Sequence, residues 1–362
     1  MPVEQYINSI IKGDTIETLK NFPDNCVDVI FADPPYFMQT TGILQRADGT
    51  GAFNGCNDDW DKYKDYAEYD QFTNKWLKEC HRILKPNGTI WVIGSFQNIY
   101  RIGYIMQNLG FWILNDIVWS KTNPTPNMAG TRFCNAHETL VWCAKSEKSK
   151  FTFNYKTMKH LNGGKQDKSV WTLGICQGKE RLKDKFGKKL HTTQKPEALL
   201  EKVILSSTKP NDIVLDPFFG TGTTGAVAKK LGRNFIGIER DEEYIFSASQ
   251  RINDIEEETN EITNLSLEVK PPKVSLSQLI EAGLIAESEI LYNLHNNKTA
   301  ILSNNNKLLY DGELYSIHAL SAMFLNKANH NGWSFFYIKR DGSLICIDEL
   351  RYKYTKIKEQ ST

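Results

Sequence analysis

The chain has 362 residues, a formal net charge of +1 and an apolar content of 40%. This length suggests roughly two domains, and the apolar content excludes a disordered chain. The 7 cysteines show no C-x-x-C spacing, which argues against a zinc site and a disulfide framework. We see no apolar run of about 18 residues and no signal-peptide pattern. We therefore expect a cytoplasmic protein with no membrane segment and no metal.

The first elements along the chain lead to one motif. Ile7–Lys12 is typical of a short strand, and Thr15–Asn21 of a helix with Thr15 as its N-cap. The apolar run Val27–Ala32 predicts a buried parallel strand. This strand ends at the segment D-P-P-Y, residues 33–36.

The D-P-P-Y segment has the chemistry of a binding site. Its two prolines end the strand and stiffen the chain that follows. Asp33 and Tyr36 would then lie at the carboxyl edge of the sheet, where open α/β sheets bind ligands. A carboxylate, a free carbonyl and an aromatic face suit a flat ring that bears an amino group. The alternative is an ordinary strand-to-turn exit.

Residues 40–62 are rich in Gly, Asp and Asn. This stretch is too long for an ordinary connection and indicates a functional loop, the alternative being a surface insertion. The elements expected after it are a helix at Tyr69–Leu84 stopped by Lys85–Gly88, a strand at Thr89–Gly94, a helix at Ile99–Leu109, and strands at Ile113–Lys121 and Glu138–Lys145.

Between Ser146 and His191 the periodicity fades and no regular element is predicted. Lys145–Lys195 holds 14 basic and 4 acidic residues, with aromatic residues between the lysines. Such a stretch can follow a phosphate backbone and contact bases. The alternative is a solvated surface insertion.

A second motif follows further along the chain. We expect a helix at Pro196–Ser207, a strand at Asn211–Asp216, a glycine-rich turn at 217–224 that opens a helix to Leu231, a strand at Asn234–Glu239, and a helix from Glu242 to about Glu258. A strand, a glycine turn and a helix in this order bind nucleotides, and Glu239 has about the spacing of an acid that accepts ribose hydroxyls. The turn alone would suit NAD as well, but Asp216 before it and the D-P-P-Y segment elsewhere favour S-adenosylmethionine.

The remaining residues predict a separate module. Residues 259–273 are charged and then Pro-rich, which is typical of a linker. Residues 274–362 contain a helix signal at Ser275–Ala282 and a hairpin signal around Asp341-Gly342. We therefore expect a domain at 1–258, containing the basic insertion 145–195, and a small α+β domain at 274–362.

D-P-P-Y at 33–36 and D-P-F-F-G-T-G at 216–222 together resemble the amino-methyltransferases of DNA, in the motif order of the β class. The blocks K-T-N-P-T-P-N-M-A-G-T-R-F-C-N-A-H-E at 121–138 and H-T-T-Q-K-P-E at 191–197 are similar to HinfI-type and cell-cycle-regulated adenine methyltransferases, which modify G-A-N-T-C. The likeness continues through N-G-W-S-F-F-Y at 331–337.

This resemblance implies a doubly wound, mostly parallel Rossmann-like α/β fold that binds S-adenosylmethionine. It implies adenine-N6 methylation of double-stranded DNA by base flipping and direct transfer. The catalytic positions that it implies are Asp33, Pro34, Pro35 and Tyr36. The cofactor positions are Asp14, Asp33, Lys195, Pro196, Asp216, Phe218, Phe219, Gly220, Thr221, Gly222, Thr223, Thr224 and Glu239.

The candidate DNA-binding residues are of two kinds. Side chains of the types that read base edges are Arg46, Asn123, Asn127, Arg132 and Asn135; Asn127 and Asn135 could equally cap turns. Lysines that would meet phosphates are Lys156, Lys159, Lys165 and Lys168. The C-terminal module would be an auxiliary DNA-contacting domain.

Three other activities remain open from the sequence. Cytosine-N4 methylation uses the same geometry, although Asp at position 33 favours adenine. The basic insertion argues against protein-glutamine methylation. The intact motifs argue against a DNA-binding protein with an inactive cofactor site. A homodimer, a cognate restriction endonuclease and an association with the nucleoid through DNA are further expectations.

Overall fold

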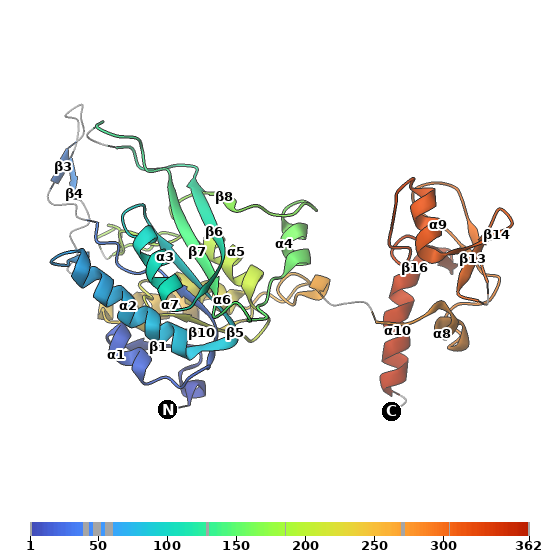
Figure 1. Ribbon diagram of the computed structural model, residues 1–362, viewed down its shortest axis with the longest axis horizontal. Helices are drawn as coiled ribbons and strands as arrows, with labels where there is room; N and C mark the ends of the chain where they lie inside the picture. Colours follow the sequence, from blue (N-terminus) through green and yellow to red (C-terminus); the bar gives the residue numbers. More distant parts are fainter. Residues whose placement is uncertain are drawn as a thin grey trace. The chain divides into compact units, whose positions relative to one another are not determined.

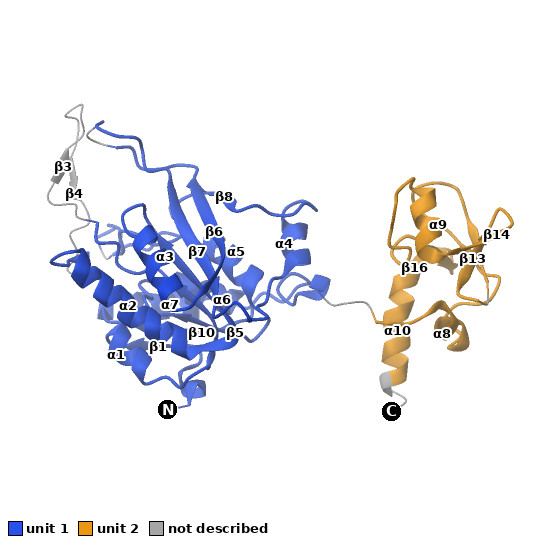
Figure 2. Cartoon of the chain, viewed as in Figure 1, with its two compact units in different colours: residues 1–268 blue, residues 269–362 orange. Residues whose placement is uncertain are grey.

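The computed structural model describes residues 2–38, 43–45, 52–54, 61–127, 130–184, 186–268, 272–303 and 305–360. The chain forms two compact units, residues 1–268 and 269–362 (Figure 2). No helix within the described part of the chain is long and apolar enough to cross a membrane. The first unit is built on an eight-stranded sheet (Figure 1).

This sheet has the strand order β1-β10-β9-β2-β5-β7-β6-β8. The strand β7 runs antiparallel to both of its neighbours, and the other neighbouring pairs are parallel. The predicted mostly parallel sheet is therefore confirmed. Its strands are β1 (Ser9–Lys12), β2 (Val27–Ala32), β5 (Leu84–Gly94), β6 (Trp112–Lys121), β7 (His137–Ala144), β8 (Val170–Leu173), β9 (Ile213–Asp216) and β10 (Asn234–Glu239).

Helices cover both faces of the sheet because both faces are apolar. In β2, Ile30 packs into one core cluster with residues of α1, α2 and α3, whereas Val29 and Phe31 pack into the other with residues of α4, α5, α6 and α7. This alternation makes the fold doubly wound. The helices are α1 (Thr15–Lys20), α2 (Tyr66–Ile83), α3 (Ile99–Asn108), α4 (Tyr155–Leu161), α5 (Glu197–Ser207), α6 (Thr223–Lys230) and α7 (Glu242–Asn253).

The structure corrects two predictions near the start of the chain. The N-cap of α1 is Asp14 and not Thr15, since the Asp14 carboxylate accepts from the backbone N–H groups of Ile16 and Glu17; a carboxylate also suits the positive end of the helix dipole. Lys85–Gly88 does not form a stop after α2 but belongs to β5. The pairing of β5 with β2 shifts register here, and this irregularity accommodates Pro86 within the strand.

Two further predictions are corrected later in the first unit. The stretch 146–191 contains α4 and β8, and β8 adds to the sheet edge through alternating exposed and buried residues. The helix α7 ends at Asn253 and not near Glu258. The C-terminal end of a helix carries a partial negative charge, so acidic side chains in the last turn are unfavourable. The helix α7 accordingly ends before the acidic run 256–258. The remaining short elements are the 3-10 helices Val3–Tyr6 and Ser266–Glu268, and the hairpin of β3 (Ile43–Gln45) and β4 (Ala52–Asn54).

The second unit has a core of its own and repeats one local design. Two hairpins turn at Asp-Gly pairs with positive φ, Asp311-Gly312 and Asp341-Gly342, and each leads directly into a helix. Phe335 and Phe336 are buried in this core. The elements are α8 (Leu276–Glu281), β11 (Ile290–Leu291), β12 (Ala300–Leu302), β13 (Lys307–Tyr310), β14 (Glu313–Ser316), α9 (Ile317–Phe324), β15 (Tyr337–Arg340), β16 (Ser343–Cys346) and α10 (Ile347–Gln360).

Candidate active site

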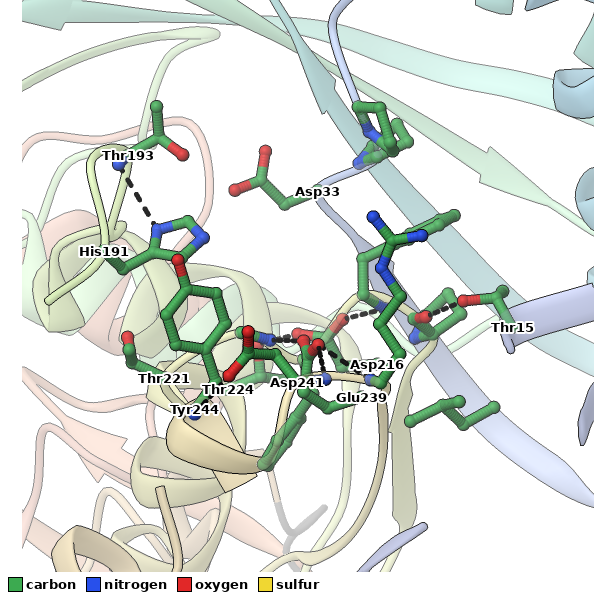
Figure 3. Close-up of a pocket in the computed structure, with 18 of the residues that line it drawn as sticks. Thr15, Asp33, His191, Thr193, Asp216, Thr221, Thr224, Glu239, Asp241 and Tyr244 are labelled. Atoms are coloured by element: carbon green, nitrogen blue, oxygen red, sulfur yellow. Dashed lines mark hydrogen bonds between the residues drawn. The ribbon is translucent and has the colours of Figure 1, made fainter. Parts of the chain in front are cut away.

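The two sequence motifs open on one cavity. The strands β2 and β9 pair in parallel, with Ile30 opposite Leu215, so Asp33 and Asp216 leave the sheet at the same edge. These two strands are therefore neighbours in the sheet. Between them lies a cavity of about 560 Å³ that both aspartates line (Figure 3).

The backbone of the D-P-P-Y segment is held from several sides. The Tyr69 hydroxyl donates to the Pro35 carbonyl at 2.8 Å. The Asp61 carboxylate accepts from the backbone N–H groups of Phe37 (2.6 Å) and Met38 (2.7 Å). Phe37 has a φ of 52°, which is uncommon for a bulky residue, so Asp61 stabilises a strained turn directly after Tyr36. Sequence reasoning missed Asp61, because this contact spans the glycine-rich loop.

Four charged side chains lie beside this segment with alternating sign. Lys195 Nζ is 2.6 Å from Asp33 Oδ2 and 3.9 Å from Glu138 Oε2. Lys121 Nζ is 2.6 Å from Glu138 Oε1. The Tyr36 hydroxyl donates to Glu138 Oε2 at 3.0 Å. Lys195, expected as a cofactor residue, therefore also pairs with the proposed catalytic carboxylate.

Burial and these charges set the ionisation of the group. Burial raises the pKa of Asp33, although Lys195 opposes this. Burial alone would lower the pKa of Lys195, but the charges of Asp33 and Glu138 outweigh it and raise that pKa. Burial alone would raise the pKa of Glu138, but Lys195 and Lys121 outweigh it and lower that pKa.

The glycine loop is fixed by close packing. A Cβ atom on Gly237 of β10 would lie 2.4 Å from the Phe219 ring, and one on Gly222 would lie 2.7 Å from Ala248. Gly222 also has a φ of 75°, which favours glycine. Phe219 can therefore stack on Phe235 beneath the loop.

Two carboxylates beside the glycine loop, at the ends of β9 and β10, accept hydrogen bonds from the chain itself. Glu239 accepts from the backbone N–H groups of Gly220 (2.7 Å), Arg240 (2.8 Å) and Asp241 (2.9 Å). Asp216 accepts from the Thr224 hydroxyl (2.6 Å) and the Phe218 N–H (2.9 Å). Burial raises the pKa of Asp216 to about 7.

Most of the predicted cofactor positions line the cavity. Gly222 and Pro196 do not, since Gly222 packs on Ala248 and Pro196 is the N-cap of α5. The cavity-lining cofactor positions are Asp14, Asp33, Lys195, Asp216, Phe218, Phe219, Gly220, Thr221, Thr223, Thr224 and Glu239. Of the proposed catalytic residues, Asp33, Pro34, Pro35 and Tyr36 all line it.

Several lining residues were missed by sequence reasoning, and two of them are paired. The ring of His191 lies 4.9 Å from the ring of Tyr244, and its Nδ1 accepts from the Thr193 N–H (Figure 3). Burial, helped by Lys195 and Arg181, lowers the pKa of His191 to about 4, so the ring is neutral near pH 7. The H-T-T-Q-K-P-E block that contains it was the available signal.

The candidate DNA-binding residues that the structure describes are not among those that line the cavity. Asn123 accepts from the Ile175 N–H and donates to Gln177, and Asn127 accepts from the Thr131 N–H, so both have local partners. The Arg132 guanidinium lies 5.6 Å from the Phe96 ring. Asn135, Lys156, Lys159, Lys165 and Lys168 are exposed, and Arg46 lies outside the described residues.

Comparisons with known proteins agree with this architecture. The family model for DNA methylases matches residues 27–250. Type II methyltransferase M.HinfI of Haemophilus influenzae is 60% identical over 98% of both chains. Type II methyltransferase M2.DpnII of Streptococcus pneumoniae is 44% identical over 69% of this chain and 91% of the relative. The structure of the PvuII DNA methyltransferase, described as cytosine-N4-specific, aligns with a TM-score of 0.53 at 24% identity, over 71% of this chain and 90% of that one.

The fold is that of a Rossmann-like methyltransferase. The chain belongs to the DNA methylase family. It is a DNA methyltransferase of the HinfI type, and S-adenosylmethionine is its methyl donor.

Proposed function

We propose that the chain methylates N6 of the inner adenine of G-A-N-T-C in double-stranded DNA. The observation that carries this is that the D-P-P-Y segment and the glycine loop open on one cavity. The pentanucleotide is supported by the 60% identity to M.HinfI, together with the likeness of the 121–138 block to enzymes of that specificity.

The cavity fits S-adenosylmethionine. Its volume of about 560 Å³ is within the usual range for small-molecule sites. Glu239 offers carboxylate oxygens to ribose hydroxyls, and the left-handed Gly220 lets backbone approach the ligand closely. The bound cofactor supplies an electrophilic methyl group on a sulfonium.

The D-P-P-Y residues that line the same cavity would hold the base. The target amino group is buried in a duplex, so the base has to flip out. Asp33 Oδ and the Pro34 carbonyl accept hydrogen bonds from the amino group and localise its lone pair toward the methyl group. Tyr36 stacks on the ring. The chain thus contributes alignment and electrostatics.

Methylating genomic DNA with the purified chain and mapping methylated bases by sequencing tests this function. We expect N6-methyladenine confined to G-A-N-T-C. Methylation of cytosine N4, or of adenine in another sequence, would contradict the assignment and leave the methyltransferase class intact. Asp at position 33 supports adenine over cytosine.

Other parts of the chain would serve DNA binding. The exposed lysines between 145 and 195 support a phosphate-contacting surface, and residues 274–362 would form an auxiliary DNA-contacting domain. Truncation after Lys273 should weaken duplex binding; unchanged binding would remove that domain from the proposal.

The proposal also includes three associations of the protein: a homodimer, a cognate restriction endonuclease, and binding to the nucleoid through DNA. Sedimentation of the pure chain tests the dimer.

A further inference from the structure

We infer that Glu138 is a positioning residue of the transfer reaction, which orients Tyr36 and, through Lys195, maintains Asp33 as the acceptor of the substrate amino group. This inference rests on the proposed function, because it needs Asp33 and Tyr36 to meet the base. Glu138 is the last residue of the 121–138 block, and the sequence indicates no role for it.

Glu138 is placed by the sheet and not by the motif that it serves. It lies on β7, two strands away from β2, and pairs with Trp119 of β6. Its side chain is 14% exposed. One carboxylate oxygen receives Lys121, and the other receives the Tyr36 hydroxyl at 3.0 Å. Both oxygens therefore have partners, and the carboxylate is held in one orientation.

The first consequence concerns the ring of Tyr36. A buried hydroxyl needs an acceptor, and Glu138 supplies it from outside the D-P-P-Y segment. Lys195 Nζ lies 5.2 Å from the centre of the same ring. Hydroxyl and ring face are thus both engaged, so the plane on which a flipped base would stack is set before the base arrives.

The second consequence concerns charge. Asp33, Lys195, Glu138 and Lys121 form a largely buried series of charges of alternating sign. A buried charge without a partner is costly. The negative charge of Glu138 helps to keep Lys195 protonated. Protonated Lys195 favours ionised Asp33, the form that accepts best from the amino group, and this effect is larger than the opposite, direct effect of Glu138 on Asp33.

Among the described residues, few titratable groups on neighbouring elements face these four charged side chains. Asp33 faces Lys195, Glu138 and Tyr36, and its charge also raises the pKa of Asp216. Lys195 additionally faces Asp216 and lowers the pKa of His191. The Tyr36 hydroxyl stays protonated, because burial, Asp33 and Glu138 hold its pKa well above the usual value.

The signs follow from these contacts. The charge of Glu138 raises the pKa of Asp33 and that of Lys195. Glu138→Gln keeps the shape and removes the charge, and its single amide oxygen has to serve either Lys121 or Tyr36. Both pKa values then fall. If the reaction needs ionised Asp33 and protonated Lys195, both limbs of its pH profile move to lower pH.

The experiment is the single-turnover rate of methyl transfer to a G-A-N-T-C duplex at saturating S-adenosylmethionine, measured across pH. For Glu138→Gln we expect a maximal rate about tenfold or more below that of the parent, both limbs at lower pH, and unchanged binding of S-adenosylmethionine. Lys121→Gln removes a positive charge from the same group of four side chains. Both limbs of the pH profile of this variant should therefore move to higher pH. This second variant tests the inference even if Glu138→Gln fails to fold.

Asp28→Asn is the matched control. Asp28 lies on the same strand as the Asp33 segment, at its other end, and pairs with Lys85 at 2.8 Å. Its loss should change stability and leave both limbs in place. The inference would be overturned if Glu138→Gln transferred methyl groups more slowly but with the pH profile of the parent. It would also be overturned if the pH profiles of Glu138→Gln and Lys121→Gln moved in the same direction. If the parent chain transfers no methyl group to adenine in this duplex, the proposed function fails instead.

Discussion

Lys195 Nζ lies 2.6 Å from Asp33 Oδ2, across 162 residues of sequence, and links the block before α5 to the end of β2. Lys195 is only 7% exposed. Because the pair is buried, water screens it little, and each member depends on the other for its charge. The block and the D-P-P-Y segment are therefore one electrostatic unit, although they match separate sequence motifs.

Asp33→Ala should nearly abolish methyl transfer and leave the fold in place. The side chain follows the last residue of β2 and points into the cavity (Figure 3), so the core strand itself is unchanged. Loss of a positioned electrostatic group in an active site costs about 10²-fold or more in rate. Single-turnover kinetics and thermal unfolding measure the two effects. Near-normal turnover by a folded variant would remove Asp33 from the mechanism.

The pKa of Asp216 predicts how cofactor binding depends on pH. Burial raises this pKa to about 7, so the acid is partly protonated near neutrality. A cationic cofactor in the same cavity favours the ionised form, and binding should therefore release a proton below about pH 7 and strengthen as pH rises through that value. Calorimetry in buffers with different ionisation enthalpies measures this proton. Asp216→Asn should lose the dependence, and a parent chain without it would contradict the prediction.

The same shift makes a signed contribution to stability. The folded-state pKa of Asp216 is above the unfolded value of 3.8, so the native state holds the proton more tightly. Its contribution to the free energy of unfolding is therefore favourable at low pH, and it is lost as pH rises from about 4 to about 7. Removing the charge with Asp216→Asn should flatten this part of the stability profile.

The strands and motifs could be predicted because their signals are local. Asn234–Glu239 matches β10 at both ends, since an apolar run bounded by a turn and an acid defines it. The neighbouring positions of β2 and β9 bring both motifs to one cavity. The strand β8 could not be predicted, because its short edge sequence of alternating exposure is paired only through tertiary contact with β6.

The two motifs of the site could be predicted from the sequence, but the residues that hold them in place could not. Asp61 contacts Phe37, directly after the D-P-P-Y segment, from 24 residues away. Glu138 contacts Tyr36 from 102 residues away. Nothing in the local sequence of Asp61 or Glu138 indicates these partners. Which side chain reaches across a sheet depends on strand order and register, so such contacts become visible only in the folded chain.

Gly237→Ala should destabilise the first unit and weaken cofactor binding. The added Cβ would lie 2.4 to 2.6 Å from three atoms of the Phe219 ring, so the ring beneath the glycine loop has to move. Overpacking of this kind costs about 1–3 kcal/mol. Gly103→Ala on α3 is the control, since its Cβ meets no atom within 4 Å and alanine favours a helix by about 1 kcal/mol. Thermal unfolding and titration with S-adenosylmethionine give the comparison; equal behaviour of the two variants would contradict it.

The double variant Lys156→Gln with Lys159→Gln should weaken duplex binding and lessen its salt dependence. Both lysines are exposed on α4, three residues apart. Each phosphate contact that is lost lowers the slope of log affinity against log salt by about 0.9. Lys75→Gln with Lys78→Gln is the matched control, because these lysines have the same spacing and exposure on α2. Binding measured at several salt concentrations separates the two pairs. If both pairs change the slope alike, α4 is no part of a specific DNA surface, because loss of any two surface cations would have had the same effect.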